Sequence, residues 1–156
     1  MVTVEMLKRF RLLAHLPRED LAELMEVCEI ERWEAGQTVG HEGARADKLR
    51  LVLLGKVALD KRIQLGRHGT VRRANVSIVG PGKAFCWSAV VAPYILTLSS
   101  VCLEPCKFIA IDSERLQTFM DENPQTARRL MSSITEVVGS RLRDATNMLT
   151  YFLSIV

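Results

Sequence analysis

The chain has 156 residues, with 21 Lys and Arg against 18 Asp and Glu, and 48% of its residues are apolar. A chain of this length can bury a complete core as one domain without disulfides or metal ions. A charged share of 25% excludes wholesale disorder. The net charge of +3 is too small to indicate nucleic-acid binding, so we expect no direct nucleic-acid partner.

We expect neither a membrane span nor a secretory signal in this sequence. It has no apolar run of about 18 residues that would cross a membrane. The first residues include the acidic Glu5 and no apolar core of a signal peptide. We therefore expect a cytoplasmic protein with no membrane partner, in which the cysteines are reduced thiols: Cys28, Cys86, Cys102 and Cys106.

Residues 1–28 are predicted to form N-terminal helices. An apolar stripe at helical spacing, preceded by Pro17 and two acids, predicts one helix; its members are Leu21, Leu24, Met25 and Cys28. A shorter helix is expected before it, around Met6 to Leu13.

Residues 29–111 are predicted to form many short strands. Leu49, Leu51 and Leu53 alternate before Gly55, and Val57 resumes a similar alternation. The turn sequence Gly80-Pro81-Gly82 and further apolar stretches at 95–101 and 108–111 follow. Short, evenly spaced strands separated by glycines indicate a barrel or a sandwich.

Residues 112–156 are predicted to be helical. Asp112 or Ser113 can cap a short helix, and Asn123 followed by Pro124 starts a second one. From there apolar residues recur at alternating spacings of four and three, interrupted by Arg141: Ala127, Met131, Ile134, Val138, Ala145, Met148 and Phe152. This period is typical of a helix packed along a partner helix.

A helix over residues 124–152 would be about 43 Å long, which is too long for one small domain to cover. We therefore expect a homodimer through residues 124–152. The alternative is that the helix folds back over its own barrel.

The order of these elements, and three local motifs, resemble the cyclic-nucleotide-binding domain superfamily. Gly36-Gln37-Thr38-Val39 with Glu42-Gly43 looks like the family's first glycine motif. The segment 51–59, LVLLGKVAL, resembles its central hairpin, and residues 80–85, GPGKAF, resemble the lead into the phosphate-binding cassette. The resemblance covers about residues 12 to 149.

This resemblance implies a mainly β fold with flanking helices: a double-stranded β-helix, or jelly-roll, barrel with N-terminal helices and a long C-terminal dimerisation helix. We expect residues 1–156 to form one such domain. Relatives of the catabolite-activator type (Crp/Fnr) continue into a helix-turn-helix, whereas this chain ends a few residues after its long helix, so we expect no DNA-binding domain.

The cassette departs from the family pattern at its two charged positions. The family uses a glutamate for the ribose hydroxyl and an arginine for the cyclic phosphate, which suit a hydroxyl donor and a pair of phosphate oxygens. Here Trp87 occupies the glutamate position, and Leu96-Thr97 occupy the arginine position. No Asp or Glu lies between Asp60 and Glu104, so no shift of alignment restores the carboxylate.

We therefore expect ordinary binding of cyclic AMP or cyclic GMP to be weak or absent, and another small ligand to be bound. Aromatic rings, hydroxyls and a thiol at the cassette suit a small, flat or apolar molecule, and a helix following Phe85 would attract an anion. The candidate ligand-binding residues are Phe85, Cys86, Trp87, Ser88, Ala89, Tyr94, Leu96, Thr97 and Arg141. The alternative is that Trp87 fills a degenerate pocket.

Two basic features have both a functional and a structural interpretation. Arg141 either reaches over the pocket from the long helix or is an ordinary solvated or inter-subunit arginine. The basic hairpin over 61–73 is either a solvated turn or a surface for an acidic partner.

The sequence offers no evidence for a metal site, a haem or catalysis. Cys102 and Cys106 have no second pair of ligands, and the three histidines include no H-x-H motif. No nucleophile elbow or phosphate-binding glycine loop is present. We therefore expect no cofactor and no metal, and a non-catalytic regulatory domain that senses a small ligand; the alternative is a ligand-free dimeric interaction module.

Overall fold

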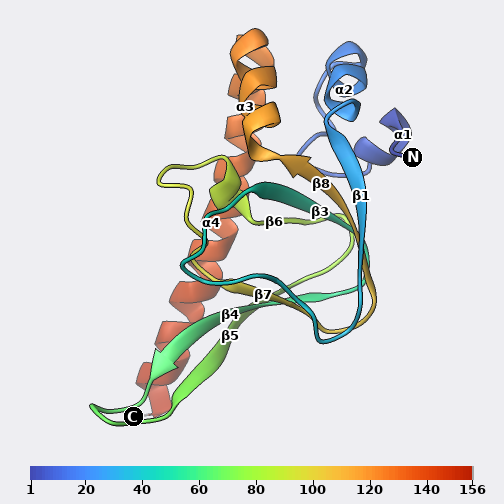
Figure 1. The fold of residues 1–156 in the computed structure, drawn as a ribbon. Helices are drawn as coiled ribbons and strands as arrows, with labels where there is room; N and C mark the ends of the chain where they lie inside the picture. Colours follow the sequence, from blue (N-terminus) through green and yellow to red (C-terminus); the bar gives the residue numbers. More distant parts are fainter. Residues whose placement is uncertain (156) are drawn as a thin grey trace.

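A computed structural model describes residues 1–155 of the chain, and Val156 of the predicted C-terminal segment lies outside the described residues. Two short helices, α1 (Val4–Leu7) and α2 (Arg18–Met25), precede eight strands, and two helices, α3 (Ser113–Glu122) and α4 (Pro124–Ile155), follow them (Figure 1). The strands are β1 (Cys28–Trp33), β2 (Thr38–Gly40), β3 (Lys48–Leu54), β4 (Val57–Gln64), β5 (Val71–Val79), β6 (Ala84–Phe85), β7 (Ser99–Cys102) and β8 (Cys106–Asp112). No helix in this described part is long and apolar enough to span a membrane.

The strands form two four-stranded antiparallel sheets. One sheet has the order β1-β8-β3-β6 and the other has the order β2-β7-β4-β5, so strands distant in sequence lie side by side in both. A single apolar core lies between and around the sheets, with Phe85 and Phe108 packed edge to face, their ring centroids 5.0 Å apart. The predicted fold class, mainly β with flanking helices in a jelly-roll arrangement, is confirmed.

The N-terminal helices are shorter than predicted. The first helix ends at Leu7, and the chain continues in turns. The prediction of a helix around Met6 to Leu13 is therefore wrong over most of that range. The second helix ends at Met25, and Cys28 belongs to β1, where it pairs with Ile111 of β8. Strand pairing therefore overrides the helical spacing at Cys28.

The starts of the two C-terminal helices agree with the prediction. Asp112 is the N-cap of α3, and its carboxylate accepts a hydrogen bond from the Arg115 backbone N–H at 2.9 Å. Pro124 is the first residue of α4. The carbonyl of Asn123 accepts from the Ala127 N–H at 2.8 Å, while its side-chain amide donates to the Phe119 carbonyl instead of capping α4.

Helix α4 runs beside the barrel and continues past it toward the tip of the β4–β5 hairpin (Figure 1). In its first half, Leu130 and Ile134 are buried in the chain's own core. In its second half, large apolar side chains are exposed: Leu142, Leu149, Tyr151, Phe152, Leu153 and Ile155. The first half thus follows the alternative in which the helix covers its own barrel.

Candidate functional site

The cassette begins where β6 ends. Phe85 is fully buried, and Cys86 after it has left-handed backbone angles, with φ of 61° and ψ of 39°. A residue with a Cβ is strained in this region, where glycine is favoured. The helix expected after Phe85 is only the single 3₁₀ turn η1 (Trp87–Ala89), so the expected anion-attracting helix start is absent from this position.

Five of the predicted site residues meet around one small cavity. Its volume is about 20 Å³, enough for about one water molecule. The predicted residues that line it are Cys86, Trp87, Ser88, Leu96 and Thr97; sequence reasoning missed Leu59, Leu98 and Ser100. None of these lining residues carries a charge.

The other predicted residues lie elsewhere. Phe85 and Ala89 are buried in the core. Tyr94 is 41% exposed and does not line the cavity. Arg141 also lies away from it and donates from Nη2 to the Ala84 carbonyl at 2.9 Å.

Leu96 closes one side of the cavity. Two hydrogen bonds fix its backbone: its N–H donates to the Ala44 carbonyl, and its carbonyl accepts from the Gly43 N–H. Its side chain packs on Gly40 so closely that a Cβ there would lie 2.8 Å from the leucine Cδ1. Leu96 also lines a second hollow of about 150 Å³, so its side chain separates the two spaces.

A buried ion pair lies behind Cys86, and sequence reasoning did not identify it. Arg50 of β3 donates from Nε to Glu31 Oε2 of β1 at 2.8 Å and from Nη2 to Oε1 at 3.4 Å. Its Nη1 lies 4.0 Å from the Cys86 sulfur. Alternation along the strands, which puts Glu29 with Glu31 and Lys48 with Arg50, was the signal available in the sequence.

The ion pair sets the electrostatics behind the cassette. Burial pushes the pKa of Glu31 upward, but hydrogen bonds from Arg50, Trp33 and Lys48 outweigh this and hold the pKa below its ordinary value. Burial also raises the pKa of the Cys86 thiol. The guanidinium of Arg50 is thus bound by a carboxylate, and Arg50 lines the second hollow of about 150 Å³ but not the cassette cavity.

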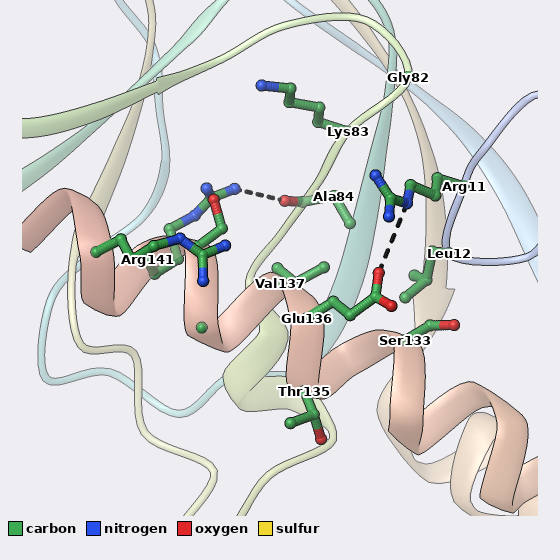
Figure 2. Close-up of a pocket in the computed structure, with 13 residues that line it drawn as sticks. Arg11, Leu12, Gly82, Lys83, Ala84, Ser133, Thr135, Glu136, Val137 and Arg141 are labelled. Carbon is green, nitrogen blue, oxygen red and sulfur yellow. Dashed lines mark hydrogen bonds and ion pairs between the residues drawn. The ribbon is translucent and has the colours of Figure 1, made fainter.

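A much larger cleft opens between α4 and the segment that leads into β6. Its volume is about 480 Å³. Figure 2 shows Arg141 reaching Ala84 on one side and Arg11 reaching Glu136 on the other, with Lys83 between them in this view. Arg143 also lines the cleft. Arg11, Lys83 and Arg143 were not predicted as site residues.

Comparison with known proteins identifies the fold and its relatives. The curated CRP-like cAMP-activated global transcriptional regulator of Mycobacterium tuberculosis is 26% identical over 114 residues, which cover 73% of this chain and 47% of the regulator. The chain therefore spans about half the length of the curated relatives it matches.

Solved structures give the same result. A proposed cyclic nucleotide-binding protein of Geobacter metallireducens GS-15 has a TM-score of 0.77 and 27% identity, covering 91% of this chain and 99% of that chain. The N-terminal domain of a Streptomyces coelicolor A3(2) transcriptional regulator has a TM-score of 0.68 and 28% identity, covering 92% and 94%. The sequence model of the cyclic nucleotide-binding domain matches residues 30–123, and the chain belongs to this family.

Proposed function

We propose that this chain is a non-catalytic regulatory domain that does not bind cyclic AMP or cyclic GMP in the family's usual way and acts as a dimeric interaction module. One observation carries the proposal: the cassette cavity of about 20 Å³ is filled by the chain's own side chains and lined by no charge. Small-molecule pockets typically have volumes of about 300–1,000 Å³. This geometry favours the ligand-free alternative over a small-ligand sensor at Trp87.

The missing charges add to the effect of the missing space. A hydrogen bond to a charged group contributes about 1.5–3 kcal/mol, and the family's glutamate and arginine positions carry Trp87 and Leu96-Thr97 here. Arg50 does not replace the arginine, because Glu31 holds its guanidinium. Ordinary nucleotide binding would therefore lose both its charged contacts.

Calorimetry with cyclic AMP and cyclic GMP tests this proposal. We expect no measurable binding at micromolar concentrations, and micromolar affinity for either nucleotide would overturn it. A thermal-shift screen with nucleotides, aromatic acids and phenols extends the test. A stabilising compound whose effect disappears in Trp87→Ala, but survives in the control Tyr94→Ala, would instead support a sensor at the cassette.

The proposed dimer would form through α4. Leu142, Ala145, Leu149 and Phe152 follow spacings of three, four and three residues, the seam of a two-helix coiled coil. Leu142, Leu149 and Phe152 are 67%, 60% and 43% exposed, so the isolated chain leaves this seam uncovered. A second copy of the same helix would cover it. We propose residues 1–156 as one domain, supported by the single core.

Size-exclusion chromatography with light scattering, which gives the mass of each eluted species, tests the dimer. The double variant Leu142→Glu/Leu149→Glu should elute as a monomer, while the matched variant Asn147→Glu/Ser154→Glu, on the other side of α4, should remain a dimer. A wild-type protein that is monomeric at micromolar concentration would contradict the proposal.

A further inference from the structure

The cleft between α4 and the segment before β6 is separate from the cassette cavity. Among the described residues, the two hollows share no lining side chain. At about 480 Å³ the cleft lies within the usual range of small-molecule sites. The α4 residues that line it end at Arg143, whereas the proposed dimer seam runs from Leu142 to Phe152.

The cleft has a strong excess of positive charge. Its described lining includes Arg11, Lys83, Arg141 and Arg143 but a single carboxylate, Glu136. That carboxylate is 3.6 Å from Arg11 Nε, in a pair that is mostly exposed and therefore weak. Cations from three parts of the chain thus face one hollow, and two of them, Lys83 and Arg143, form no ion pair among the described residues.

Arg141 is the buried member of this group. Its side chain is 11% exposed; Nη2 donates to the Ala84 carbonyl, and Nη1 lies 3.7 Å from Asp144. Its Nε is buried and has no hydrogen-bond partner among the described residues. Burial lowers the pKa of Arg141 despite Asp144. A buried guanidinium with an unsatisfied N–H indicates a place for an acceptor.

We propose that this cleft binds a small molecule bearing a phosphate group, with Arg141 as the principal contact and Lys83, Arg11 and Arg143 contributing charge. The unpartnered Nε–H of Arg141 can donate to a phosphate oxygen, and several cations favour a group carrying more than one negative charge. The occupied site would join α4 to the segment that leads into the cassette, since Arg141 already contacts Ala84.

Titration calorimetry with inorganic pyrophosphate at low ionic strength, on the full chain, tests the site. We expect binding that weakens about tenfold or more in Arg141→Gln and by a smaller factor in Lys83→Gln. Lys83 is exposed on a turn, so that variant tests the proposal even if Arg141→Gln fails to fold. The matched control Arg72→Gln removes the same charge from the exposed β4–β5 hairpin and should leave the affinity unchanged.

Three outcomes would overturn the proposal. The first is that pyrophosphate does not bind to the wild-type chain. The second is that Arg72→Gln weakens binding as much as Lys83→Gln does. The third is that citrate binds more tightly than pyrophosphate, which would identify a carboxylate site. A second titration with glucose 6-phosphate distinguishes organic from inorganic phosphate. The seam variant Leu149→Glu/Phe152→Glu lies outside the cleft lining and should bind pyrophosphate normally, so failure of the dimer proposal remains distinguishable from failure of this one.

Discussion

Two hollows adjoin the β6 segment, one at Lys83 and Ala84 and the other at Cys86, and they differ in both volume and charge. The cassette cavity holds about 20 Å³ and is lined by uncharged residues, whereas the cleft at α4 holds about 480 Å³ and is lined by four cations. In the alignment that the resemblance implies, bulky Trp87 and Leu96 stand at the family's charged positions, which would account for both the missing charge and the small volume. The contrast supports the proposal that the cassette of this chain is closed to nucleotides, while a separate and strongly basic hollow is open on the same scaffold.

The largest expected effect concerns the charge buried behind the cassette. Glu31→Ala should lower the free energy of unfolding by about 3–5 kcal/mol, because it leaves the guanidinium of Arg50 buried and unpaired. Urea denaturation measures this loss. The double variant Glu31→Leu/Arg50→Met should be close to wild type in stability. A Glu31→Ala variant as stable as wild type would mean that Arg50 reaches solvent or another acceptor.

The next largest effect is expected at Leu96, which closes one side of the cassette cavity. Leu96→Ala should cost about 2–5 kcal/mol, since the leucine is 8% exposed and separates two spaces that its removal would join. Leu96→Met keeps the volume and should cost less than about 1.5 kcal/mol. Chemical denaturation of both variants checks the pair. Equal stabilities would indicate that the cassette is already open in solution.

Acid should affect the cassette side of the molecule through Glu31. Its pKa in the folded chain lies below the ordinary value of 4.5, so its contribution to stability is present above that value and is lost as the pH falls through the folded-state pKa. Urea midpoints measured from pH 6 down to pH 3 should fall, and Glu31→Gln should flatten this part of the profile. An unchanged slope in that variant would assign the acid sensitivity to other carboxylates, such as Glu42, whose pKa is also lowered.

The smallest effect on stability is expected on the cleft side. Arg11→Gln breaks only an exposed pair with Glu136 and should change the unfolding free energy by less than about 1 kcal/mol. Its affinity for pyrophosphate should nevertheless fall, because the cleft loses a cation. A large loss of stability, seen in the same denaturation experiment, would show that Arg11 holds the N-terminal segment rather than serving the cleft.

Local chemistry made much of the fold predictable. The side-chain cap at Asp112 and the proline at the start of α4 act within one helical turn, and both were identified correctly. Cys28 was misassigned because the helical spacing of its neighbours continues up to it, whereas its pairing with Ile111 depends on a strand that is distant in sequence. Helices and strands could be predicted from the sequence where the contacts that decide between them are local.

The site was less predictable, because its volume depends on contacts between distant residues. The absence of acidic residues between Asp60 and Glu104 was visible in the sequence, but the small volume of the cavity depends on Leu96 packing against Gly40. The pairing of Glu31 with Arg50 spans β8, which lies between their strands in the sheet. The cleft brings Arg11 to α4 across most of the chain length, and no local pattern indicates this.

The position of β5 at the end of its sheet has a consequence for solubility. This nine-residue strand pairs with one strand, β4, so its outer edge has no strand partner among the described residues. Such an edge can recruit a strand from another molecule and begin aggregation. Arg72 and Arg73, both exposed on this strand, oppose that addition, because a docking strand would have to crowd and desolvate two like charges. We therefore expect these two charges of the basic hairpin to disfavour strand pairing between molecules.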